Sequence, residues 1–145
     1  TDEWTCAVSE TQALAAVGVG KLAYFGLSMG SLFGIPFIAS RDDVTVAALG
    51  LVGVKSNFPH DQELLEAAAK IDCPLLFLMQ LEDELFVRDG YLEVFDTFAS
   101  VDKRLHANPG PHPEIPGEEI DFAFEFVNGH INGTIQRRIV NPLAE

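Results

Sequence analysis

A serine flanked by glycines is the first candidate for chemistry in this sequence. Residues 26–30 read GLSMG, so that Ser28 stands at the centre of the pattern G-x-S-x-G. An apolar run precedes this pattern and a helix-compatible segment follows it, which predicts a one-residue turn from a strand into a helix. Such a turn strains the serine backbone and projects the hydroxyl above the sheet, where the Met29 N–H could donate to an oxyanion. We therefore predict a nucleophilic serine; the alternative is an ordinary serine in a glycine-rich loop.

A serine nucleophile needs a base, and the base needs a carboxylate that orients it. Asp83 follows the apolar segment 74–80, and His112 follows the segment 103–107 within NPGPHPEIP. Both side chains would lie at the carboxyl end of a strand, and the chain order serine, acid, histidine is one of the three known triad orders. The alternatives are a solvated acidic loop and a turn histidine held between prolines.

Other residues compete for these two roles. Glu82 and Glu84 stand on either side of the predicted acid and are its rivals. The remaining histidines fit a catalytic position less well, because they fall within a predicted strand or near the ends of predicted helices: His60, His106 and His130.

The elements that must position these residues follow from the hydrophobic pattern. Short apolar runs predict four strands, at 21–27, 44–52, 74–80 and 103–107. Helical spacing and helix-start residues predict helices at 2–17, 29–39, 61–70 and 89–100. Strands that alternate with helices indicate an α/β domain with a mostly parallel sheet and helices on both faces. In such a sheet, active sites lie at the carboxyl ends of the strands.

The last predicted element is ambiguous. The segment 118–131, EEIDFAFEFVNGHI, has apolar residues at both strand and helix period, and its acidic start and its length favour a helix. On that helix Phe122 and Phe126 form a flank beside the main apolar face, which includes Phe124. The flank is either additional core or an exposed patch that needs a partner.

From about Asp2 to Ile131 the chain resembles the C-terminal half of an α/β-hydrolase, of the compact esterase or dienelactone-hydrolase-like type. YFGLSMGSLFGIPFIAS resembles the nucleophile turn, CPLLFLMQLEDELF the acid-bearing strand and loop, and KRLHANPGPHPEIP the histidine loop. The resemblance implies that Ser28 is the nucleophile, Asp83 the acid and His112 the base. It also implies cleavage of a carboxylic ester, thioester or lactone through an acyl-enzyme.

The resemblance also implies how much of the fold is present. The four predicted strands match the fifth to eighth strands of an α/β-hydrolase, and the N-terminal half is absent. We expect residues 1–131 to form this C-terminal part of the domain and residues 132–145 to form a tail. The segment 53–60 is too short for the cap that many relatives insert there. We therefore expect an open site, lined by Met29, Phe58 and Phe86, for small soluble ester substrates.

Composition restricts the classes of partner. The 145 residues carry a formal net charge of −13, which disfavours nucleic acid and anionic membranes. No apolar run approaches the ~18 residues that a membrane-spanning helix needs. Cys6 and Cys73 lie far apart, and no metal-ligand spacing or phosphate-binding glycine loop is present. We expect a cytoplasmic protein that uses no metal and no organic cofactor.

The predicted strand within Lys21–Leu27 raises a folding problem. In the fold that the chain resembles this strand is central, whereas here one of its edges would be bare and apolar, a feature that natural proteins avoid. We expect the N-terminal half of the fold to cover it, in the same gene product or as a separate chain, or else a second copy to pair with it. A second hypothesis follows, in which the chain is a non-catalytic half-fold that serves as an association module. The presence of serine, acid and histidine together favours the hydrolase.

Overall fold

A four-stranded parallel sheet forms the centre of the molecule. The structure is a computed structural model that describes residues 2–14, 16, 20–56 and 59–135. The strands are β1 (Leu22–Phe25), β2 (Val44–Gly50), β3 (Leu75–Gln80) and β4 (Lys103–Asn108). They lie side by side in sequence order, and each pairs in parallel with the next. The predicted parallel sheet is confirmed.

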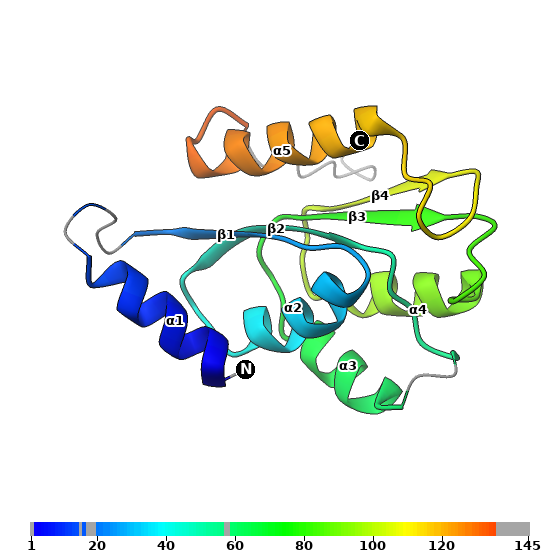
Figure 1. Cartoon of the computed structure of the whole chain (residues 1–145), viewed down its shortest axis with the longest axis horizontal. Coiled ribbons are helices and arrows are strands. Elements are labelled where there is room, and N and C mark those ends of the chain that lie inside the picture. The colour runs from blue at the N-terminus through cyan, green and yellow to red at the C-terminus, as the bar shows by residue number, and fades with distance from the viewer. Residues whose placement is uncertain (1, 15, 17–19, 57–58, 136–145) are drawn as a thin grey trace, which may run out of the picture.

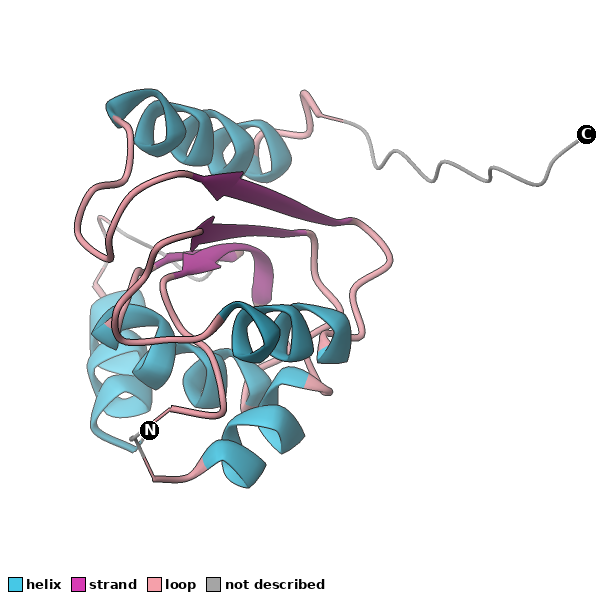
Figure 2. Ribbon diagram, turned by 90° about the vertical axis from the view of Figure 1, so that its right-hand side faces the viewer, coloured by secondary structure: helices cyan, strands magenta, loops and turns pink. Residues whose placement is uncertain are grey.

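Helices cover both faces of this sheet. They are α1 (Asp2–Gln12), α2 (Met29–Ala39), α3 (Asp61–Ala68), α4 (Arg88–Thr97) and α5 (Gly117–Ile131). Helix α5 lies on one face, and α1 to α4 lie on the other (Figure 1), a layering that is seen again in the perpendicular view (Figure 2). The predicted α/β fold is confirmed. None of the helices in the described residues is long and apolar enough to cross a membrane.

The two faces of the sheet bury two separate clusters of apolar side chains. In β2 and β3 alternate residues point to opposite faces, and both sets are fully buried. One set faces α2, α3 and α4: Ala47, Leu49, Leu75 and Phe77. The other set faces α5: Val46, Ala48, Leu76 and Leu78. Burial on both faces explains why these strands read as continuous apolar runs.

Helix α1 is shorter than predicted. The sequence predicts a helix over 2–17, whereas α1 ends at Gln12 and a turn follows it; residues 15 and 17–19 lie outside the described residues. No residue of α1 is fully buried, and Leu14 beyond it is 58% exposed. A helix with so little tertiary packing gains little from being extended.

The ambiguous last segment is a helix, α5, and its aromatic residues are arranged differently from the expected pattern. Phe126 is 1% exposed and belongs to the core, and Phe122 packs partly buried beside it, so these two residues are additional core. Phe124, which the sequence assigns to the main apolar face, is instead 56% exposed. Its ring stacks on Phe25 of β1, with 4.9 Å between ring centroids. The exposed aromatic residue of α5 is therefore Phe124, beside the outer edge of β1.

Candidate active site

The turn between β1 and α2 has the sharp geometry that the sequence predicts. Ser28 has φ 55° and ψ −118°, a backbone conformation that is rare for a residue with a side chain. A Cβ atom on Gly26 would lie 2.9 Å from the carbonyl group of Gly30, so that a side chain there would collide with backbone. The Ser28 N–H donates to the Gly50 carbonyl at 2.9 Å, which ties the turn to the end of β2.

Two buried side chains hold this turn from beneath. The Ser31 Oγ lies 2.7 Å from the carbonyl oxygens of Gly26 and Gly50 and accepts from the Gly50 N–H at 2.8 Å. The Tyr24 hydroxyl donates to the Gly30 carbonyl at 2.7 Å. Local strain of this kind persists only where the surroundings over-determine it, and these bonds are part of that support.

The three predicted catalytic side chains meet above the carboxyl ends of the strands. The Ser28 Oγ lies 2.7 Å from His112 Nε2. His112 Nδ1 lies 2.7 Å from Asp83 Oδ2. Ser28 follows β1, Asp83 follows β3 and His112 follows β4, so the sheet brings together residues that are 84 and 29 positions apart in the chain. This is the geometry of a nucleophile, a base and an orienting carboxylate.

The carboxylate of Asp83 is buried and well supplied with donors. Its side chain has no exposed surface. Oδ1 accepts from the Leu85 and Phe86 N–H groups at 2.7 and 3.1 Å, and Oδ2 accepts from the Tyr91 hydroxyl as well as from His112. Burial by itself would raise the pKa of Asp83, but the bonds from Tyr91, His112 and the two backbone N–H groups outweigh burial and lower the pKa below its ordinary value. Asp83 therefore stays ionised.

The two rivals of Asp83 bind the backbone of the histidine loop. Glu82 Oε2 accepts a hydrogen bond from the Gly110 N–H. Glu84 Oε2 accepts from the backbone N–H of His112 at 2.9 Å. Three consecutive carboxylates thus bind the same loop, and the one in the middle reaches the imidazole ring.

The residues expected around the serine lie as follows. Met29 is the first residue of α2, so its N–H is one of those that an α-helix leaves without an intrahelical partner. Its side chain is 67% exposed beside the serine. Phe86 is buried, and its ring centroid lies 5.9 Å from that of His112. Phe58, the third expected pocket residue, lies outside the described residues.

The structure is similar to solved esterases. A cold-adapted esterase from an Arctic intertidal metagenomic library is 33% identical, with a TM-score of 0.72 over 93% of this chain and 56% of that chain. An esterase of Pyrococcus furiosus gives a TM-score of 0.73 at 13% identity, over 89% of this chain and 61% of that chain. A monoacylglycerol lipase of Paleococcus ferrophilus gives a TM-score of 0.64 at 15% identity, over 90% of this chain and 73% of that chain. All three have the α/β-hydrolase fold.

The chain belongs to the α/β-hydrolase superfamily. It spans about half the length of the Arctic esterase, 53% to 56% of that chain in its three structures. This share agrees with the expectation that only part of the α/β-hydrolase fold is present. No protein-family model matches the sequence, and no curated protein matches it.

Two residues of this candidate site were not predicted from the sequence. Tyr91 of α4 reaches Asp83, as described above. Gln80, the last residue of β3, is 1% exposed, and its Nε2 lies 2.8, 3.3 and 3.4 Å from the carbonyl oxygens of Glu114, Pro111 and Pro109. The signal for Gln80 was available, because a polar residue that closes a buried apolar strand needs hydrogen-bond partners. Nothing in the sequence distinguishes Tyr91 from an ordinary core aromatic residue.

The other histidines lie away from this site in separate pairs. His106 Nδ1 is 2.7 Å from Glu119, His130 Nε2 is 3.4 Å from Asp102, and His60 pairs with a glutamate on the surface. Within the described part of the chain, no group of three or more histidine, cysteine or acidic side chains could hold a metal ion.

Proposed function

We propose that this chain carries the catalytic residues of a serine hydrolase that cleaves a carboxylic ester, thioester or lactone. The observation that carries the proposal is the hydrogen-bonded series from Ser28 through His112 to the ionised Asp83, with 2.7 Å at each step. Two of the similar proteins are named as esterases and one as a monoacylglycerol lipase, which supports an ester as the substrate. A formal net charge of −13 disfavours polyanionic partners and supports a small molecule.

The chemistry follows from the positions of the proton acceptors and donors. His112 Nε2 takes the hydroxyl proton as Ser28 Oγ attacks the substrate carbonyl carbon, and Asp83 stabilises the imidazolium that forms. The Met29 N–H donates to the oxyanion of the tetrahedral intermediate. The intermediate collapses to an acyl-enzyme as His112 returns the proton to the leaving group. Water, activated by His112, then releases the acid and restores Ser28.

The substrate that we propose is small and soluble. The connection from β2 to α3 is short, Leu51–His60, and leaves no room for a cap over the serine. The exposed Met29 side chain and the buried Phe86 ring are apolar groups next to Ser28 and His112. Cys6 is exposed, Cys73 is buried, and neither forms a disulfide within the described residues, which is compatible with the reducing cytoplasm, where we propose that the enzyme acts.

We further propose that the remaining strands of the α/β-hydrolase fold cover the outer edge of β1. These strands would also bring the loop that carries the second oxyanion donor, and the loss of one donor costs about 10²–10³ in turnover. On one face of the sheet, Phe25 and Phe124 form an exposed stack beside this edge. The opposite edge strand, β4, carries Lys103 and Arg104, which is how proteins protect a permanent edge.

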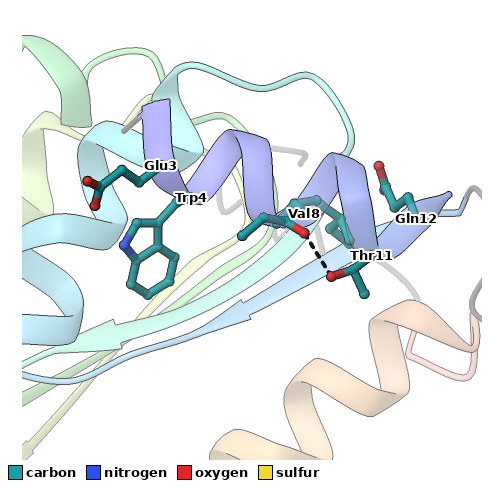
Figure 3. A pocket seen from close by; sticks show the side chains of 7 residues that line it. Glu3, Trp4, Val8, Thr11 and Gln12 are labelled. Carbon is teal, nitrogen blue, oxygen red and sulfur yellow. Dashed lines mark hydrogen bonds between the residues drawn. The ribbon is translucent and has the colours of Figure 1, made fainter. Parts of the chain in front are cut away.

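An apolar groove lies beside β1 on the other face of the sheet. Figure 3 shows it between α1 and the sheet, with the Trp4 side chain reaching from α1 toward the strands. The groove has a volume of about 430 Å³ and is lined by Glu3, Trp4, Ala7, Val8, Thr11, Gln12 and Leu22. Trp4 is 50% exposed although its ring lies 5.8 Å from that of Phe37. Apolar surface on both sides of one strand edge is what an interrupted sheet leaves exposed.

The same surface supports the second candidate function, an association module without catalytic activity. In that case the β1 edge pairs with another chain or a second copy, and the serine turn is only structural. The site argues against this reading. A structural turn needs the strained backbone of Ser28 but has no need of a buried, ionised Asp83 that bonds the imidazole of His112.

Reaction with a fluorophosphonate tests the two functions against each other. We expect the full chain to gain one adduct by intact mass, and peptide mapping to place it on Ser28. Ser28→Ala should remove the adduct, and the control Ser40→Ala, which alters a hydroxyl at the C-terminal end of α2, should keep it. A folded sample that takes up no adduct, or takes it up elsewhere, would contradict the hydrolase and favour the association module.

A further inference from the structure

One oxygen of the predicted catalytic acid has two donors. The Tyr91 hydroxyl donates to Asp83 Oδ2, the same atom that lies 2.7 Å from His112 Nδ1. The other oxygen, Oδ1, is taken by two backbone N–H groups. The orientation of the carboxylate is therefore fixed by the backbone on one side and by a tyrosine on the other. Of the donors to Oδ2, only Tyr91 has no part in the proposed proton transfer.

Packing fixes the position of the Tyr91 hydroxyl. Tyr91 is 0% exposed, and its ring makes edge contacts with Phe77 and Phe86 at centroid distances of 6.2 and 5.9 Å. The start of α4 lies against the first residues of the connection that follows β2, where a Cβ on Gly53 would come 2.9 Å from the Tyr91 nitrogen. A tyrosine confined in this way cannot follow a carboxylate that rotates, so it selects one orientation.

We propose that Tyr91 is a positioning residue for the hydrolysis, which holds the Asp83 carboxylate in line with His112 and shares its negative charge. The inference rests on the proposed function of the same site. Burial, and next the bond to Asp83, raise the pKa of Tyr91, so its hydroxyl remains a proton donor over the whole working range. A second donor on Oδ2 limits how strongly the carboxylate stabilises a protonated His112.

The other groups that face His112 do not change when Tyr91 is replaced. The loop after β3 contributes the carboxylates of Asp83 and Glu84, and the turn between β1 and α2 contributes the Ser28 hydroxyl. The next carboxylate, Glu82, bonds the Gly110 N–H and has the Arg88 guanidinium at 3.5 Å. Removal of the Tyr91 hydroxyl thus alters one donor to Oδ2 and leaves these charges in place.

The test compares Tyr91→Phe with the parent by the rate of fluorophosphonate labelling of Ser28 as a function of pH. With one donor fewer, Asp83 stabilises protonated His112 more strongly. In the plot of labelling rate against pH, the midpoint of the rise on the acidic side should then move to higher pH by about half a unit to one unit. The labelling rate on the plateau should fall about three- to tenfold. The control Phe98→Leu alters a core ring that contacts Phe77 but not Asp83, and it should lower the melting temperature without moving the midpoint. An unmoved midpoint in Tyr91→Phe would overturn the proposal.

A second readout separates this inference from the proposed function. The His112 Cε1 proton can be followed by NMR over the same pH range, after its signal is assigned with a His112→Gln variant. If the parent fails to label, the proposed hydrolase fails, and the NMR titration still decides the role of Tyr91. An upward shift of the His112 titration in Tyr91→Phe supports the positioning role, and coincident curves overturn it.

Discussion

At the scale of single residues, three neighbouring carboxylates have different tasks because their surroundings differ. Asp83 has no exposed side-chain surface and accepts four hydrogen bonds. Glu82 and Glu84 are exposed, and each accepts a hydrogen bond from a backbone N–H group of the histidine loop. Donors keep a buried carboxylate ionised, and because little water screens its charge, it stabilises a neighbouring positive charge more strongly than an exposed carboxylate does. We therefore expect the rate of Ser28 labelling to respond differently when each of the three residues loses its charge.

Replacement of these carboxylates by amides ranks them. Asp83→Asn should lower the rate of fluorophosphonate labelling of Ser28 by about 10³–10⁴-fold, because an amide does not stabilise the imidazolium and favours the wrong tautomer. Glu84→Gln should cost less than about tenfold, because the amide oxygen still accepts from the His112 N–H. Both variants should keep the circular dichroism spectrum of the parent. A larger loss in Glu84→Gln than in Asp83→Asn would mean that Glu84 is the functional acid.

At the scale of elements, the end of β3 carries both the acid and the support of the histidine loop. The buried amide of Gln80 faces three carbonyl groups of the loop 109–114. This loop contains bends and turns but no helix or strand. The Gln80 side chain joins this loop to the end of β3, and Glu82 and Glu84 join it to the loop that follows β3. The Oε1 atom of Gln80 is buried and has no hydrogen-bond partner among the described atoms. The amide is therefore oriented entirely by the carbonyl groups that its nitrogen binds.

Gln80→Met tests this support, because methionine has a similar volume and no donor. We expect labelling of Ser28 to slow about three- to tenfold and hydrogen exchange of residues 109–115 to become faster, since three carbonyl groups of the loop lose the donor that they share. The matched control is Gln62→Met on α3, where the side chain bonds Glu66 on the surface. It should change neither quantity. Exchange in the loop equal to that of the parent would show that Gln80 does not hold the loop.

The elements also show what the sequence could predict. The parallel sheet, the turn at Ser28 and the positions of Asp83 and His112 followed from local signals, namely apolar runs, glycine spacing and the strand ends. The hydrogen bond from Tyr91 could not be predicted, because its direction depends on where α4 packs against the β2 connection. The face of α5 was assigned incorrectly for a similar reason: Phe124 and Phe126 both fit helical spacing, and only contact with the sheet shows that Phe126 is buried. The end of α1 was misplaced because little tertiary packing supports a longer helix.

At the scale of the whole molecule, the two edges of the sheet differ in chemistry. Strand β4 carries Lys103, whose Nζ bonds three carbonyl groups at the end of α4, together with Arg104 and His106. Strand β1 has the sequence LAYF and pairs only with β2 among the described strands. An exposed apolar edge recruits further strands unless charge, proline or a covering element prevents it. We therefore propose that further strands or another chain pair with the β1 side of the sheet and not with the β4 side.

This asymmetry predicts self-association of the isolated chain through the β1 side. In sedimentation velocity we expect species larger than a monomer that grow with concentration, because the β1 edge and the stack of Phe25 on Phe124 remain uncovered. Phe124→Ser should shift the distribution toward the monomer by removing the outer ring of that stack. The control Val101→Ser removes a side chain that is 68% exposed next to β4, at the protected edge, and should leave the distribution unchanged. A parent chain that sediments as a single monomer and unfolds cooperatively would show that β1 needs no cover, and the proposal that further strands complete this sheet would fail with it.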